Sequence, residues 1–209
     1  MTSSPITISR PRLVYFDFAG RAQAIRDALA IGGVAFEDVR VTYAEFVARR
    51  ASGELPYGSL PALQLPDGSW LGQSNTILRW AGHQAGLTPR DPLQALRVDA
   101  ILDCVEDFGG RVSTSIRVQD EGVRAALRAQ LAKQWLPEFY GLLTRHLLDN
   151  AGWLAAGALT VADLKVVHLI DKLTNGSLSG LPTDALTDFP EVDAWRQRVH
   201  AERQRRLGL

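Results

Sequence analysis

The first part of the chain alternates between short apolar runs and segments whose apolar residues recur at helical spacing. Four runs rich in β-branched and aromatic residues predict strands, over residues 12–16, 36–41, 60–65 and 69–71. Helices are predicted over residues 22–29, 43–51 and 74–84, and Pro66-Asp67-Gly68 is typical of a turn. The order is βαβ, a loop, then ββα, which predicts a small mixed sheet with helices on its faces.

The second part of the chain contains no convincing strand and predicts helices only. Apolar spacing marks one helix over residues 98–108, and residues 123–148 form a long amphipathic segment in which Pro137 predicts a kink or a break. Thr160 and Asp163 match the acidic variant of a capping box, ahead of an apolar helix that we expect to be buried. A last helix is expected over residues 189–203.

The change of pattern near residue 90 indicates two domains. Residues 86–92 have the composition of a linker, which we place at 87–92. We therefore expect a flexible N-terminal segment over residues 1–11, an αβ domain over 12–86 and an all-helical domain over 93–209.

The overall composition limits the classes of function. The chain has 209 residues, of which 46% are hydrophobic and 22% charged, as is ordinary for a globular protein. Basic and acidic residues number 23 each, so the zero net charge gives no support for a nucleic-acid partner. No apolar run approaches the ~20 residues of a membrane helix. Residues 1–11 lack the apolar stretch of a signal peptide. We expect a cytoplasmic protein with no membrane partner.

The metal and thiol chemistry available to the chain is limited. Its single cysteine, Cys104, excludes an internal disulfide framework and a cysteine-based zinc cage, and is interpreted as a packed small residue. The four histidines lack the mutual spacing of a metal site. Asp103, Glu106 and Asp107 form an acidic cluster, which is either a divalent-cation site or a solvated or interface face.

Three positions in the first part are candidates for ligand chemistry. Pro61 stands at the start of a strand, either as an ordinary first residue or after a cis peptide bond that turns the backbone of Leu60 towards an extended peptide. Ser74 is predicted as the N-cap of its helix, and the same helix start suits a carboxylate, with the Gln73 amide beside it. Tyr15 is either a buried aromatic residue or a hydrogen-bond donor at the carboxyl end of its strand.

These motifs, in this order, resemble cytosolic glutathione transferases with a catalytic tyrosine, and among them the sigma class. The resemblance covers about residues 12–200 and implies a thioredoxin-like N-terminal domain followed by an all-helical domain. It rests on five segments. The first is Leu13-Val14-Tyr15-Phe16 with Gly20-Arg21-Ala22, Ile25-Arg26, Gly33-Val34 and Phe36-Glu37-Asp38. The others are Pro56-Tyr57-Gly58-Ser59-Leu60-Pro61, Gln73-Ser74, Val98 to Phe108, and Trp153 to Leu164.

The resemblance implies a role for each matched residue in binding the cosubstrate glutathione. Tyr15 would donate a hydrogen bond to the glutathione sulfur, flanked by Arg21 as a second catalytic residue. Leu60, next to a cis Pro61, would pair its backbone with the cysteinyl part of the tripeptide. Gln73 and Ser74 would hold the γ-glutamyl carboxylate, and Asp107 of the partner subunit would reach the γ-glutamyl amine.

The chain departs from the sigma-class pattern at two further positions. Phe46 stands where that class usually has tryptophan, which removes an indole N–H donor from the glycyl end of the site. Ala19 replaces an arginine often found two positions before Arg21, so the sulfur pocket is expected to be less electropositive. Either Arg49 or Arg50 would supply the cation near the glycine carboxylate.

The implied activity is conjugation of glutathione to small hydrophobic electrophiles, a detoxification reaction. A hydrogen bond to a charged group is worth roughly 1.5–3 kcal/mol, which lowers a thiol pKa by about one to two units. Most of the bound thiol would then be ionised at neutral pH. The alternatives are glutathione-dependent isomerisation or peroxide reduction on the same site, or a non-catalytic carrier of apolar ligands. The resemblance also implies a homodimer and no tightly bound cofactor or metal.

Overall fold

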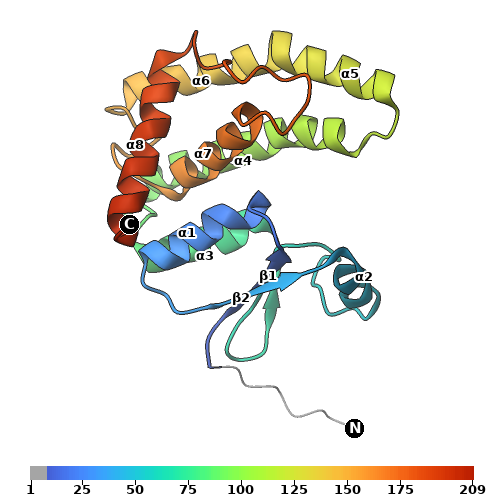
Figure 1. The fold of residues 1–209 in the computed structure, drawn as a ribbon. Coiled ribbons are helices and arrows are strands. Elements are labelled where there is room, and N and C mark those ends of the chain that lie inside the picture. The colour runs from blue at the N-terminus through green and yellow to red at the C-terminus, as the bar shows by residue number, and fades with distance from the viewer. Residues whose placement is uncertain (1–8) are drawn as a thin grey trace. The chain divides into compact units, whose positions relative to one another are not determined.

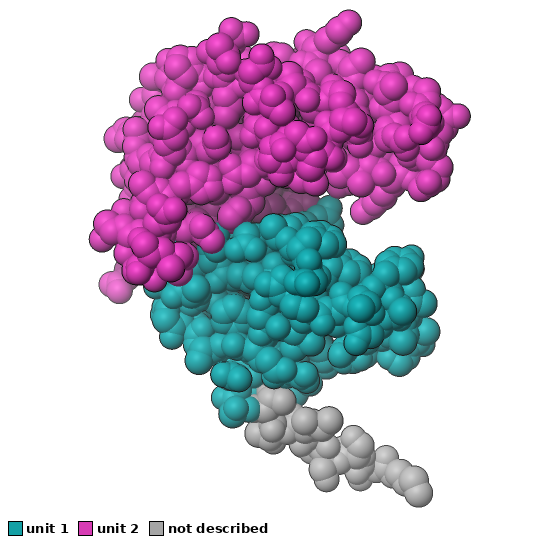
Figure 2. All heavy atoms as spheres, in the orientation of Figure 1, with its two compact units in different colours: residues 1–88 teal, residues 89–209 magenta. Residues whose placement is uncertain are grey.

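The computed structural model describes residues 9–209 and divides them into two compact units, up to Thr88 and from Pro89 onward (Figure 2). Most of the predicted N-terminal segment lies outside the described residues. Each unit is presented separately below. No helix of the described residues is both long enough and apolar enough to cross a membrane.

The first unit is a four-stranded sheet with helices packed against it (Figure 1). Its elements are β1 (Arg12–Phe16), η1 (Gly20–Ala22), α1 (Gln23–Ile31), β2 (Glu37–Val41), α2 (Tyr43–Ala51), β3 (Ala62–Gln64), β4 (Trp70–Leu71) and α3 (Ser74–Ala85). The strand order is β2-β1-β3-β4, with β1 parallel to β2 and antiparallel to β3. The predicted thioredoxin-like arrangement is confirmed.

The core of this unit forms because β1 and the inner faces of α1 and α3 are apolar. Leu13, Ile25 and Ile77 are all 0% exposed, and α1 and α3 lie side by side. The helix α2 starts where the pattern predicts, because Thr42 and Glu45 form a capping box. β3 is shorter than predicted, since pairing with β1 begins only at Ala62.

The second unit is helical throughout its described residues. It consists of α4 (Pro92–Arg117), α5 (Glu121–Gln130), the π-helical turn η2 (Leu131–Trp135), α6 (Leu136–Asp149), α7 (Val161–Thr174) and α8 (Pro190–Leu207). α4 is longer than the predicted 98–108 and begins at the end of the expected linker. The Asp91 side chain accepts a hydrogen bond from the Gln94 N–H, and Pro92 fits the first helical position.

The predicted interruption near Pro137 takes the form of a wide turn. Proline has no N–H to donate to the carbonyl four residues earlier, which here is Lys133. The π-helical turn η2 ends at Trp135, two residues before Pro137, and α6 then begins at Leu136 with Pro137 in its first turn. Regular α-helical hydrogen bonding is therefore broken while the chain remains helical.

Asp163 is the buried polar centre of the second unit. Its carboxylate is 0% exposed and accepts hydrogen bonds from Thr160 N–H (2.9 Å), Thr160 Oγ1 (2.8 Å), Leu154 N–H (3.1 Å) and Trp195 Nε1 (2.9 Å). Burial raises the pKa of this carboxyl, and the hydrogen bonds act in the opposite direction. One side chain thus joins the start of α7, the preceding loop and α8.

We expect Asp163→Ala to lower the free energy of unfolding by about 3 kcal/mol, since several buried donors lose their acceptor. Asp163→Asn keeps one acceptor oxygen, so its free energy of unfolding should lie between those of the wild type and the alanine variant. Denaturant unfolding without ligand measures both. A loss under about 1 kcal/mol for the alanine variant would show that these donors find other partners.

Candidate active site

The Tyr15 phenol lies near the end of β1, with its oxygen held by the backbone. The residue is 6% exposed, and its Oη accepts a hydrogen bond from the Arg21 N–H at 3.2 Å. The rings of Phe16 and Phe18 meet it edge-on, at centroid distances of 5.5 and 5.4 Å. The bond from Arg21 uses the acceptor capacity of the phenol and leaves its O–H available as a donor.

Gly20 allows the backbone to approach this phenol. A Cβ at this position would stand 2.5 Å from Tyr15 Oη, and the residue has φ of +43°. Both the space and the conformation therefore exclude a larger side chain. Gly20 lies four residues after the end of β1, and a glycine so close to the end of a strand is the sequence signal for this contact.

The backbone of Leu60 lies at the entry to β3. The Leu60–Pro61 peptide bond is cis, which is the second of the two alternatives considered for this proline. The first residue of β3 paired with β1 is Ala62, opposite Val14. Among the described residues, the Leu60 N–H and C=O take part in no backbone hydrogen bond outside the regular elements. They can therefore pair with an added extended chain.

The start of α3 corrects one prediction. Ser74 is not the N-cap: Gln73 is, because the Gln73 carbonyl accepts the first helical hydrogen bond, from the Ile77 N–H at 3.1 Å. Ser74 is the first residue within the helix, one position too late to cap it. The Gln73 side chain makes no capping bond either, so the amides of the first turn are not capped by that side chain.

Gln73 adopts a backbone conformation that is unfavourable for its residue type. Its φ is 70° and its ψ 109°, outside the regions that non-glycine residues normally occupy. Such strain is typical of ligand-binding sites in which the surrounding structure determines the backbone. The preceding Gly72 lies against the Tyr57 ring, where a Cβ would stand 2.6 Å from Cδ2.

The two candidate cations on α2 have different surroundings. Arg49 Nη1 donates to Glu54 Oε1 at 2.6 Å, so this charge is paired within the unit. Arg50 lies beside Gly58, where a Cβ would stand 3.4 Å from Arg50 Nε. Arg50 therefore borders the loop that leads to Leu60, whereas the Arg49 charge is paired with Glu54.

Phe46 connects α2 to the phenol through aromatic contacts. Its ring meets Phe16 edge-on at 5.5 Å, and Phe16 stacks on Phe18 at 5.5 Å. The first unit thus brings together the end of β1, the entry to β3, the start of α3 and one face of α2. Of the predicted residues, Asp107 alone lies in the second unit, exposed on α4.

The sequence leaves the acidic cluster on α4 open between a divalent-cation site and a solvated or interface face. No group of three or more histidine, cysteine, aspartate or glutamate residues in the part of the chain that the structure describes is arranged to hold a metal ion. Glu106 instead pairs with Lys165 at 2.5 Å. Burial, with a smaller contribution from Asp107, raises the pKa of the Cys104 thiol, which makes it a poor nucleophile.

Comparison with known proteins agrees with this arrangement. Residues 106–204 match the family model described as the glutathione S-transferase C-terminal domain. A curated relative, probable glutathione S-transferase 8 of Caenorhabditis elegans, is 30% identical over 91% of this chain and 90% of its own.

Solved structures of related proteins have the same fold. Prostaglandin synthase D of Nilaparvata lugens has a TM-score of 0.82 at 28% identity, covering 91% of this chain and 92% of its own. Monomeric Na-GST-3 of Necator americanus has a TM-score of 0.81 at 28% identity, covering 95% and 94%. The chain belongs to the glutathione S-transferase family. It is a glutathione S-transferase, with glutathione as its cosubstrate.

We expect Gln73→Gly to raise the free energy of unfolding by about 1 kcal/mol, because it relieves the strained backbone at a smaller entropic cost. Gln73→Ala keeps the strain and should give no such gain. Both variants remove the amide and should weaken glutathione binding equally in calorimetric titration. If the glycine variant is no more stable than the alanine variant, the backbone at this position is not strained.

Proposed function

We propose that Tyr15 activates the glutathione thiol by donating its phenolic O–H to the sulfur. The observation that carries this proposal is the hydrogen bond from the Arg21 N–H to Tyr15 Oη. That bond fixes the orientation of the phenol and directs its proton away from the backbone. A charge-assisted bond worth roughly 1.5–3 kcal/mol would bring the thiol pKa from about 8.5 to near or below neutrality. Arg21 contributes through its backbone N–H.

We assign the rest of the tripeptide to the other elements of the first unit. The Leu60 backbone pairs with the cysteinyl residue as a strand would. The amides at the start of α3, with the Gln73 amide and the Ser74 hydroxyl, bind the γ-glutamyl carboxylate at the positive end of the helix dipole. Arg50 takes the glycine carboxylate, and Phe46 supplies an apolar wall there without a hydrogen-bond donor.

The proposed enzyme is sigma-like and transfers glutathione to small hydrophobic electrophiles. In this proposal residues 12–86 bind glutathione, and residues 93–209 carry the electrophile-binding groups, around Gly110, Arg111 and Thr114. We place the reaction in the cytoplasm, where thiols are kept reduced.

A second candidate reaction is glutathione-dependent isomerisation on the same site. The observation that favours it is the similarity to a solved structure whose title is prostaglandin synthase D. The same thiolate would serve both reactions. A panel that contains electrophiles for conjugation and substrates for isomerisation separates the two reactions by their relative kcat/KM.

We further propose a homodimer in which Asp107 of the partner subunit binds the γ-glutamyl amine. Support comes from the position of Asp107, exposed on α4 and next to other carboxylates. A two-fold interface presents the same face of each copy to the other. One of the similar structures is described as monomeric.

Tyr15→Phe is expected to lower kcat at neutral pH by roughly tenfold to a hundredfold, because it deletes the donor and keeps the ring. The KM for glutathione should change much less, and the acid limb of the pH–rate profile should move up by about one to two units. Tyr43→Phe is the control, since Tyr43 is 72% exposed on α2. A Tyr15→Phe rate within twofold of wild type would assign activation to another group.

Arg50→Gln should remove the preference for glutathione over γ-glutamylcysteine, which lacks the glycine carboxylate. Loss of the bond between Arg50 and the glycine carboxylate should weaken the affinity for glutathione roughly tenfold. The affinity for γ-glutamylcysteine should not change. Arg49→Gln is the matched control, since its charge is paired with Glu54. Should Arg49→Gln abolish the preference while Arg50→Gln retains it, the assignment of the two arginines is reversed.

Light scattering at micromolar concentration is expected to give twice the 22.9 kDa mass of the chain. Asp107→Asn should leave that mass unchanged and weaken glutathione binding, because the amine loses its charged partner. A particle of 22.9 kDa would overturn the dimer. Unchanged affinity in a dimeric Asp107→Asn variant would remove Asp107 from the site.

A further inference from the structure

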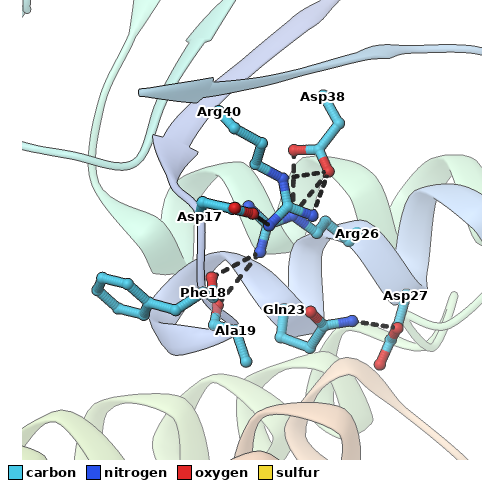
Figure 3. A network of polar contacts seen from close by, with 8 residues as sticks. All are labelled: Asp17, Phe18, Ala19, Gln23, Arg26, Asp27, Asp38 and Arg40. Carbon is cyan, nitrogen blue, oxygen red and sulfur yellow. Dashed lines mark hydrogen bonds and ion pairs between the residues drawn. The ribbon is translucent and has the colours of Figure 1, made fainter. Parts of the chain in front are cut away.

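Arg26 is a buried charged residue of the first unit that none of the roles above uses. It lies on α1 with a side chain that is 7% exposed (Figure 3). Its Nε lies 3.1 Å from both carboxylate oxygens of Asp38 on β2. Its Nη1 donates to the carbonyl oxygens of Phe18, at 3.1 Å, and Ala19, at 3.3 Å. One guanidinium thus joins a helix, a strand and the segment that follows β1.

That segment carries the partner of the Tyr15 phenol. Phe18 and Ala19 are followed directly by Gly20, whose backbone lies against the phenol, and by Arg21, whose N–H binds the phenolic oxygen. A shift of the two carbonyls would therefore move the N–H that orients the phenol. The guanidinium carbon of Arg26 also lies over the Tyr15 ring, 5.7 Å from its centre. Two kinds of contact from Arg26 thus converge on one residue.

The charge of Asp38 is shared between two arginines. Arg40 also binds Asp38, through Nε at 2.8 Å and Nη2 at 2.6 Å, and is more exposed than Arg26. Arg40 also contacts the segment after β1, through the exposed side chain of Asp17 at 3.3 Å. Asp38 therefore keeps a cationic partner when Arg26 is replaced, and Arg40 serves as a matched control.

We propose that Arg26 is a positioning residue for thiol activation. By holding the carbonyls of Phe18 and Ala19 and covering the Tyr15 ring, it keeps the Arg21 N–H on the phenolic oxygen and the phenolic proton directed at the sulfur. Its planar fork reaches Asp38 and both carbonyls at once, which a lysine ammonium cannot reproduce. This inference rests on the proposed role of Tyr15.

The test compares Arg26→Lys, Arg26→Gln and Arg40→Gln in steady-state conjugation assays. Arg26→Lys keeps a positive charge beside Asp38, so the test does not depend on the folding of the glutamine variant. We expect Arg26→Lys to lower kcat by about tenfold to a hundredfold, as misplacement of a reacting group does. The KM for glutathione should stay within about threefold, since the residues assigned to the tripeptide are untouched. Arg40→Gln should remain within twofold of wild type.

Two readouts distinguish positioning from a merely structural role. The acid limb of the pH–rate profile, and the ultraviolet titration of the enzyme-bound thiolate, should both move to higher pH in Arg26→Lys. In the Tyr15→Phe background, Arg26→Lys should cost less than twofold, because its effect passes through the missing hydroxyl.

An unchanged pH profile in Arg26→Lys, or a full repeat of its rate loss in the Tyr15→Phe background, would overturn the inference. The two proposals fail in different ways. A fully active Tyr15→Phe removes the proposed role of Tyr15, whereas a slow Tyr15→Phe with a normal Arg26→Lys removes only the role of Arg26.

Discussion

The backbone N–H of Arg21 donates a hydrogen bond to the phenolic oxygen of Tyr15, and the first unit is arranged around that bond. This bond requires that the chain reverses direction after β1 and that Gly20 lets the backbone approach the Tyr15 ring. It also requires an anchor for the carbonyls of Phe18 and Ala19, which Arg26 provides. A backbone N–H is always a donor, and this contact requires no particular side chain at position 21. A phenol held in this way has one remaining hydrogen-bonding direction for its proton, which is the property that the proposed thiol activation requires.

Most of the fold could be predicted from the chain, because each element carries its own local signal. The apolar run at β1, the capping pairs before α2 and α7 and the turn at Gly68 act over a few residues. The lengths of the strands and helices were predicted less accurately than their positions. β3 begins only where a partner strand exists, and the length of α4 depends on a cap at Asp91 that the apolar spacing does not include.

The candidate site was predicted less completely, because its details depend on single dihedral angles. Serine is a residue type that is common at N-caps. The backbone conformation of Gln73, however, makes Gln73 the N-cap of α3. Arg49 and Arg50 are neighbours in sequence and about 100° apart on a helix, so only their surroundings separate them. Arg26 and Asp38 are 12 positions apart in the sequence, and only the folded unit shows that they form an ion pair.

The π-helical turn before Pro137 shifts the register of the helix that follows it. A wide turn holds one more residue than an α-helical turn, which rotates all later side chains by about 100° around the axis. The apolar stripe of α6, with Phe139, Tyr140 and Leu143 all buried, is set by that rotation. The turn therefore has the same effect on α6 as one extra residue placed in a regular α-helix.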